Sequence, residues 1–366
     1  MKKILSMIMV SALMLNLAAC GKETTTAVVE EAAEVVTEEV TEEVVEANEE
    51  EVSAEEVAES EEAVYPVTIT DQAGREVTIE KEPETLVSGY YISSSLLIAL
   101  ELDDKMVGIE AKAGKRPIYK LAAEELIDLP NVGSAKEFDL EGCAALNADL
   151  VILPMKLKEA AATLEELGIK TILVNPESEE LLLEMIDIIS TATNTVDRAQ
   201  EIKNFINTNK DMLNEKLVDA DKKNVYLAGN SSILSTAGTK MYQCDMISLA
   251  GGNSVADIED KYWVDVDYEQ ILAWDPEYIF IAAEADYSVE DVLADETLSE
   301  CSAVKEGNVY KFPSDAEAWD SPVPSGILGS VWMASVLHPD VIPSEESDSI
   351  IEDFYETFYG FKYSEK

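Results

Sequence analysis

Residues 195–220 read TVDRAQEIKNFINTNKDMLNEKLVDA and predict one long helix. The apolar positions recur at helical spacing, and neither Gly nor Pro interrupts the run. They are Ala199, Ile202, Ile206, Leu213, Leu217 and Ala220. At 1.5 Å per residue, such a helix would be about 39 Å long. Short strands and helices alternate on both sides of it, so we expect a stiff connection between two α/β lobes, residues 65–194 and 221–366, with a cleft between them. The alternative is a long surface helix within a single domain.

The first residues are typical of a lipoprotein signal. Two lysines precede an apolar run from Ile4 to Leu17, which is too short to span a membrane comfortably. The run leads into LAAC, which resembles the lipobox of bacterial lipoproteins. We therefore expect residues 1–19 to be a signal peptide and Cys20 to carry the lipid that anchors the chain to the outer face of the bacterial cytoplasmic membrane. An ordinary signal peptide with a chance cysteine is the alternative.

Residues 20–64 predict an acidic, disordered tether. Of the 44 residues 21–64, 17 are Glu and one is Lys, and none is aromatic. Such a segment cannot bury enough apolar surface to fold, and its like charges extend it. A calcium-binding acidic tail is the alternative. The whole chain carries a net charge of −49, which argues against nucleic acid as a partner.

The remaining cysteines, Cys143, Cys244 and Cys301, are widely spaced and odd in number. This pattern indicates neither a disulfide framework nor a zinc site. We expect them to be small buried residues.

Beyond the tether, strands alternate with helices, which implies parallel sheets. A hairpin over residues 67–79 is followed by strands expected at 85–88, 105–109, 149–153, 171–174, 224–228, 278–282 and 309–312. Further helices are expected at 93–100, 139–146, 158–167, 241–249, 268–273, 288–293, 325–337 and 347–358.

Several stretches, taken in order, resemble the substrate-binding proteins of ABC importers for iron-siderophores, haem and cobalamin. They are TDQAGREV at 70–77 with Pro83, LDDKMVGI at 102–109, LE at 140–141 running to ADLV at 148–151, LAGG at 249–252, YEQI at 268–271 leading to Asp275, Pro276 and Ile279, and LGSVWMA at 328–334. The resemblance implies two α/β lobes with mainly parallel sheets, joined by one long helix, and a monomer that binds its ligand in the cleft. The implied partners are an importer permease with its ATPase.

The resemblance also implies that one exposed Glu on each lobe docks onto the permease. The matching residues are Glu141 and Glu269. Each lies near the start of an expected helix, where the helix dipole gives an acidic residue a purely structural reason to be there.

Aromatic and basic residues follow the strand ends, where ligands of open α/β sheets bind. Seven of the 26 basic residues fall within residues 112–158. Aromatic faces with a few cations suit a negatively charged organic chelate. The candidate ligand-binding residues are Tyr90, Tyr91, Arg116, Tyr119, Lys156, Tyr262, Trp263 and Trp319, with the two tryptophans forming an apolar wall from the second lobe. The alternative is that these are solubilising loop residues and half-buried packing residues.

The favoured ligand is a metal chelate, foremost a ferric siderophore; a corrinoid, haem or a molybdate-type oxyanion are the alternatives. We expect no cofactor or metal of the protein's own. The only histidine is His338, outside the expected cleft, and the chain lacks HExxH, GxSxG, P-loop and GxGxxG motifs, which argues against an enzyme. A carboxylate-dependent hydrolase around Trp263, Asp265 and Asp267 is one alternative. An adhesin or structural lipoprotein is another.

Overall fold

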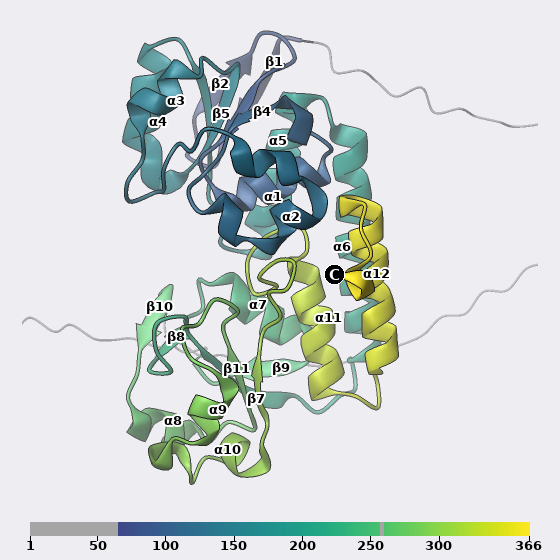
Figure 1. The fold of residues 1–366 in the computed structure, drawn as a ribbon. Helices are drawn as coiled ribbons and strands as arrows, with labels where there is room; N and C mark the ends of the chain where they lie inside the picture. The colour runs from purple at the N-terminus through teal and green to yellow at the C-terminus, as the bar shows by residue number, and fades with distance from the viewer. Residues whose placement is uncertain (1–64, 257–259) are drawn as a thin grey trace, which may run out of the picture. The chain divides into compact units, whose positions relative to one another are not determined.

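Two separate sheets of parallel strands carry the fold (Figure 1). The structure is a computed structural model that describes residues 65–256 and 260–366, all of which belong to one compact unit. The predicted signal peptide, Cys20 and the acidic tether lie outside the described residues. Within the described part, no helix has both the length and the apolar character needed to cross a membrane.

The first sheet has the strand order β4-β3-β5-β6, all parallel. Its strands are β3 Leu86–Ser88, β4 Met106–Gly108, β5 Leu150–Pro154 and β6 Lys170–Val174. Every residue of β3 and β5 is buried, as expected for parallel strands that are covered on both faces. The predicted hairpin forms β1 Val67–Thr70 and β2 Glu76–Ile79, which packs beside β6.

The second sheet has the order β12-β11-β7-β9, again all parallel. Its strands are β7 Lys223–Ala228, β9 Gly252–Ser254, β11 Tyr278–Ile281 and β12 Val309–Lys311. A short antiparallel ribbon, β8 Ser235–Ala237 with β10 Trp263–Asp265, forms a sheet of its own that packs beside β7.

Helices fill the connections between the strands. Before the long helix come α1 Tyr91–Ala99, α2 Pro117–Ala122, α3 Leu140–Ala145, α4 Lys158–Glu166 and α5 Glu179–Thr193. After it come α7 Tyr242–Leu249, α8 Tyr268–Trp274, α9 Val289–Leu293, α10 Ser302–Glu306, α11 Gly326–Leu337 and α12 Ser344–Tyr359. We call the described residues before the long helix the first half and those after it the second half.

The long helix is α6 Val196–Lys216, with Thr195 and Leu217 as its caps. It buries Ala199, Ile202, Ile206, Asn209 and Leu213, which include most of the predicted apolar stripe. It packs against α5 of the first half and against α7 and α11 of the second half. The helix therefore contacts both halves.

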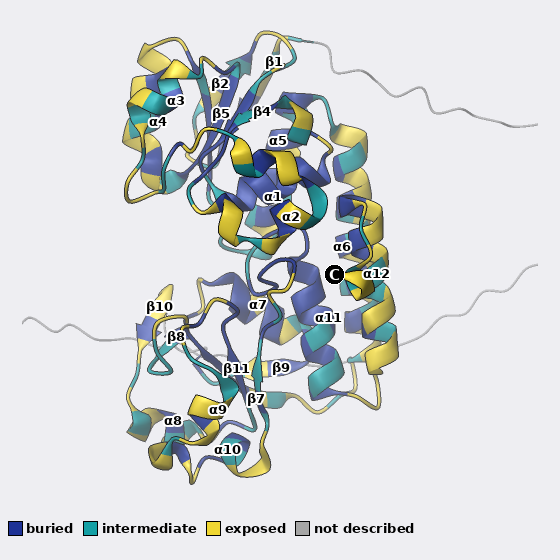
Figure 2. Cartoon of the chain, viewed as in Figure 1, coloured by how far each residue is buried: buried dark blue, intermediate teal, exposed yellow. Residues whose placement is uncertain are grey.

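A second helix lies along α6 and strengthens this connection (Figure 1). Phe205 of α6 meets Phe354 and Phe358 of α12 edge to face, with ring centroids 5.2 and 5.7 Å apart. Figure 2 shows α11 buried over most of its surface, whereas α12 has one buried and one exposed face. The largest apolar cluster runs through α1, α5, α6, α11 and α12 and includes strands of both sheets, so the halves share one continuous core.

The predicted fold class is confirmed, and the predicted strands and helices recur with ends shifted by a few residues. Two differences stand out. The predicted helix 195–220 ends at Lys216, and the next residues form a turn in which Val218 is exposed. The helix α5, which packs against both β1 and α6, was not predicted. The three later cysteines are free and buried, as expected.

Candidate ligand-binding site

A cavity of about 250 Å³ lies between the two halves, at the carboxyl ends of strands from both sheets. The first half lines it with Tyr91, Lys115, Arg116 and Pro117, which follow β3 and β4. The second half lines it with Ala283, Glu284, Ser314, Ala316, Glu317 and Ala318, which follow β11 and β12. Open α/β sheets bind their ligands at this edge.

Arg116 provides a positive charge at the cavity wall. It precedes α2, where extended backbone at Arg116 and Pro117 at the first helical position start the helix. Its guanidinium carbon lies 3.6 Å from the centre of the Tyr91 ring, which is a cation–π contact. Its Nη1 donates to Glu284 Oε1 at 2.7 Å, across the boundary between the halves. Its Nε is buried and has no hydrogen-bond partner among residues 65–256 and 260–366.

The second half contributes a buried carboxyl, Glu317, to the wall of the cavity. Glu317 accepts hydrogen bonds from Ser95 Oγ at 2.5 Å and from Ser325 Oγ at 2.6 Å. The Tyr91 hydroxyl lies 3.5 Å from the same carboxyl. Burial raises the pKa of Glu317 above its ordinary value, although these hydroxyl groups counteract part of the effect. Burial also raises the pKa of Tyr91 well above its ordinary value, so its hydroxyl stays protonated.

A second buried carboxyl lies within the first half. Glu110 accepts a hydrogen bond from the Tyr119 hydroxyl at 2.6 Å and from Ser94 Oγ at 2.5 Å. Burial raises the pKa of Glu110 above its ordinary value. Tyr119 is fully buried in this network, so it belongs to the core and does not line the cavity.

The cavity can therefore hold a small ligand by charge and by hydrogen bonds. Its cations are Lys115 and Arg116, and its hydroxyl groups belong to Tyr91 and Ser314. Among the described residues, no cluster of His, Cys, Asp and Glu could hold a metal ion directly.

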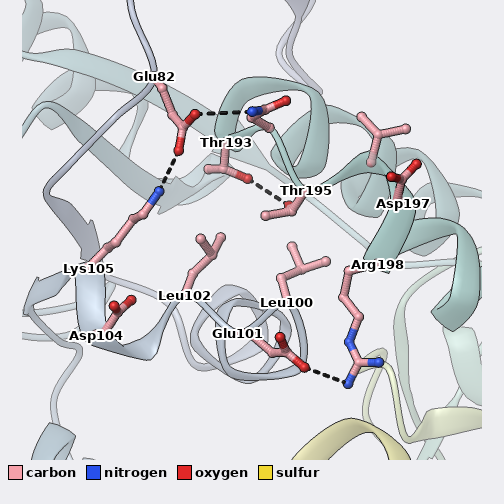
Figure 3. A pocket seen from close by; sticks show the side chains of 12 residues that line it. Glu82, Leu100, Glu101, Leu102, Asp104, Lys105, Thr193, Thr195, Asp197 and Arg198 are labelled. Atoms are coloured by element: carbon pink, nitrogen blue, oxygen red, sulfur yellow. Dashed lines mark hydrogen bonds and ion pairs between the residues drawn. The ribbon is translucent and has the colours of Figure 1, made fainter. Parts of the chain in front are cut away.

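A larger cavity of about 450 Å³ lies elsewhere, at the junction of α5 and α6 (Figure 3). Two ion pairs line it: Glu82 with Lys105 at 2.7 Å, and Glu101 with Arg198 at 3.3 Å. It lies away from the carboxyl ends of the strands. The cavity between the halves is therefore the candidate ligand site.

The sequence of residues 86–316 matches the family model described as "Periplasmic binding protein". This stretch makes up more than half of the chain and contains strands of both sheets. The chain belongs to the periplasmic binding protein family. This binding protein is accordingly the extracytoplasmic solute-binding component of an ABC importer and not an enzyme, which removes the hydrolase alternative.

Relatives of this binding protein agree with the assignment. The molybdate-binding protein MolA of Haemophilus influenzae is 25% identical over 324 residues, which cover 81% of this chain and 91% of MolA. YvrC of Bacillus subtilis, named as an uncharacterized ABC transporter substrate-binding lipoprotein, is 25% identical over 76% of this chain and 87% of its own. The crystal structure of MolA bound to molybdate matches the fold with a TM-score of 0.72 at 23% identity, over 81% of this chain and 99% of that chain.

Of the residues proposed from the sequence of this binding protein, Tyr91 and Arg116 line the cavity. Tyr90 lies beside it, half-buried at the N-cap of α1. Lys156 is exposed and follows β5. Burial raises the pKa of Glu177, and the nearby charge of Lys156 offsets part of that rise. Neither Tyr90 nor Lys156 is among the lining residues.

The proposed aromatic wall does not form as expected. Trp319 is buried, with its indole N–H donating to the Tyr355 hydroxyl at 2.8 Å and its ring 5.4 Å from that of Tyr363. A large ring whose N–H finds a partner is well suited to the core. Tyr262 and Trp263, by contrast, are 48% and 41% exposed at β10 and lie outside the lining residues.

The two carboxylates proposed to dock onto the permease are placed alike. Glu141 and Glu269 are both exposed, and each lies in the first turn of a helix, α3 or α8. In both helices the N-cap is an aspartate, Asp139 or Asp267, whose side chain already accepts from a backbone N–H. The capping role is therefore filled without the glutamates.

Two residues that line the cavity were not among the candidate ligand-binding residues. Glu284 and Glu317 line the cavity, yet they are two of 75 acidic residues with no distinctive motif around them. Glu284 comes three residues after β11 ends at Ile281, and this position was the available signal, because residues after parallel strands reach the ligand edge.

Proposed function

We propose that this binding protein captures a small oxyanion of the molybdate class between its halves and delivers it to its importer permease. The observation that carries the proposal is Arg116: a mostly buried guanidinium, stacked on Tyr91, with a buried Nε that lacks a partner among the described residues. A cavity of about 250 Å³ is smaller than the roughly 300–1,000 Å³ of pockets that hold drug-sized ligands. The similarity to MolA, a molybdate-binding protein by name, supports the same class of ligand.

A ferric siderophore, the ligand favoured by the sequence, is the second candidate. One observation favours it: the Trp263 ring lies against Gly229, directly after β7, with a ring carbon 3.0 Å from where a Cβ of that residue would stand. An exposed aromatic ring at the carboxyl end of a strand suits a larger chelate that extends outward from Arg116. Haem and corrinoids would use the same surface.

The experiment is a titration of the purified protein by calorimetry with sodium molybdate, a ferric catecholate siderophore, haem and cobalamin. If molybdate is the ligand, Arg116→Ala should weaken its binding about 10- to 150-fold, because a charge-assisted hydrogen bond is worth roughly 1.5–3 kcal/mol. Lys120→Ala is the matched control, since Lys120 is an exposed cation on α2 that does not line the cavity.

Each result decides between the ligands. Tight binding of the siderophore with no binding of molybdate would replace the first candidate by the second. Equal affinities in the parent and in Arg116→Ala would mean that the ligand does not use this cavity.

We further propose that Cys20 carries the lipid anchor and that the chain acts as a monomer. The name of the relative YvrC, a substrate-binding lipoprotein, supports the anchor. Glu141 and Glu269 are proposed to face the permease. Their exposure at the starts of α3 and α8 supports that role.

A further inference from the structure

We propose that Glu284 is a built-in competitor for the ligand: its carboxylate occupies Arg116 until an incoming anion displaces it. The inference rests on the proposed function, since it concerns the same guanidinium. Glu284 belongs to the second half and lies 168 positions from Arg116 in the chain. The ion pair between them therefore bridges the cavity and fills the place that a bound anion would need.

The two partners differ in how firmly they are held. The Arg116 side chain is 23% exposed and rests on the Tyr91 ring, whereas the Glu284 side chain is 54% exposed. Among the described residues, Glu284 forms no ion pair other than the one with Arg116. Exposed carboxylates lose little when an ion pair breaks, because water replaces the partner. Glu284 is thus the partner that can leave.

Hydrogen bonds hold the backbone around Glu284, so the carboxylate can leave Arg116 by rotation of the Glu284 side chain alone. The Ala283 N–H donates to Asp320 Oδ2 at 3.2 Å, and the Asp286 N–H donates to the Asn230 carbonyl at 3.2 Å. The carbonyl of Ala285 accepts from Lys311 Nζ at 2.7 Å. These bonds hold the backbone of Glu284 in place, so the carboxylate can return to Arg116 when the ligand leaves.

The other carboxyl on this wall cannot act in the same way. Glu317 is buried and is held by Ser95 and Ser325, so moving it would leave two buried hydroxyl groups without their acceptor. Displacement of Glu284 exposes a charged group to water, whereas displacement of Glu317 would break a buried network.

A tethered competitor makes the site selective. A carboxylate attached next to its partner acts at a high effective concentration, on the order of millimolar for short flexible links. Weakly binding monovalent anions such as chloride or acetate cannot displace it at similar concentrations. An oxyanion that bridges the two terminal nitrogens of Arg116 gains a second hydrogen bond, whereas the carboxylate of Glu284 accepts from Nη1, and the oxyanion can displace the carboxylate.

The first test needs no ligand. The chain has three arginines, Arg75, Arg116 and Arg198, and phenylglyoxal modification of each can be followed by peptide mass spectrometry. In Glu284→Ala, Arg116 should react about 1.5 to 5 times faster than in the parent, the ratio expected for loss of an exposed ion pair. Arg75 and Arg198 are references within the same molecule, and their rates should not change.

Asp286→Ala is the matched control variant. Asp286 is an exposed acidic residue two positions from Glu284 and does not line the cavity. Its removal changes the net charge by the same amount, so it should leave the reactivity of Arg116 as in the parent. An unchanged Arg116 rate in Glu284→Ala, or an equal rise in Asp286→Ala, overturns the proposal.

The second test uses sodium molybdate in calorimetric titrations at low and at high chloride. Glu284→Ala should bind molybdate about 1.5 to 5 times more tightly than the parent. It should also lose more affinity when chloride is added, while Asp286→Ala follows the parent. Weaker binding by Glu284→Ala would overturn the proposal and make Glu284 a ligand contact. If molybdate does not bind the parent at all, the proposed ligand is wrong, and the modification rates alone decide the role of Glu284.

Discussion

The first half lines the cavity with the cations Lys115 and Arg116, whereas the second half lines it with the carboxyls of Glu284 and Glu317. The positive charge is held in place, because Arg116 rests on the Tyr91 ring. The negative charge is divided between a buried carboxyl inside a network and an exposed one with a single ion pair. In the proposed site, the buried carboxyl belongs to a network that supports the fold, and only the exposed carboxyl competes with the anion for Arg116.

Removing the buried carboxyl tests the structural side of this comparison and should have the largest effect. Glu317→Ala leaves the hydroxyls of Ser95 and Ser325 without their acceptor and creates a cavity in the core. We expect the free energy of unfolding to fall by about 3 kcal/mol or more, since each unsatisfied buried group costs about 1–3 kcal/mol. Urea denaturation measures the loss.

Glu317→Gln is the control for that measurement. It keeps the size of the side chain and one acceptor oxygen, so it should lose about 1 kcal/mol. A loss in Glu317→Ala no larger than in Glu317→Gln would contradict a structural role for the carboxyl.

The stability of the protein as a function of pH tests a third carboxyl of the second half, Asp320. Asp320 is buried and accepts from the backbone N–H of Ala283 beside Glu284, and burial raises the pKa of Asp320 from 3.8 to about 6. A carboxyl whose pKa is higher in the folded than in the unfolded state adds to the stability at low pH. The contribution is complete below the pKa of the carboxyl in the unfolded chain. This contribution should therefore disappear as the pH rises from about 4 through about 6, a loss of about 2–3 kcal/mol.

Asp320→Asn isolates this contribution, because the amide does not titrate. The stability of the parent relative to Asp320→Asn should fall between pH 4 and pH 7, as measured by urea denaturation at each pH. A difference that is constant with pH, or one that grows as the pH rises, would mean that the carboxyl is not protonated in the folded state at low pH.

Substitution of the exposed carboxylates Glu141 and Glu269 should have the smallest effect on ligand binding. The cavity walls differ in charge between the halves, whereas Glu141 and Glu269 place one exposed carboxylate on each half alike. Changing both to Ala should alter ligand affinity less than about twofold and should reduce uptake by cells, because exposed charges chiefly affect association with a partner. Glu159→Ala with Glu290→Ala is the control, since these exposed glutamates also lie in first helical turns. Equal uptake in the two double variants would argue against docking through these residues.

Local pattern alone was sufficient for much of the fold. The apolar stripe of residues 195–220 predicted α6, since a helix face is set by spacing of 3 and 4 residues along the chain. The short apolar runs between turns likewise predicted both parallel sheets. Residues that follow strands are also recognisable from the sequence, which is why Tyr91 and Arg116 were proposed and were found on the cavity wall.

The tertiary structure decided which residues face one another across the cavity. Arg116 and Glu284 are 168 positions apart, and Tyr91 and Glu317 are 226 positions apart. No local periodicity connects residues so distant, because their pairing depends on how the two sheets pack against the shared helices.

Tertiary contacts also decided which tryptophan side chains are buried. Trp319 and Trp263 look equivalent in the sequence, yet one is buried and the other is 41% exposed. Trp319 packs against Tyr355 of α12 and against Tyr363, which come at least 36 positions later in the chain. The sequence by itself determined most of the helices and strands and the edge at which a ligand is expected, because these follow from neighbours in the chain. Which charges face one another at that edge depends on contacts that form only when the chain folds. The same contacts decide which aromatic rings are buried in the core.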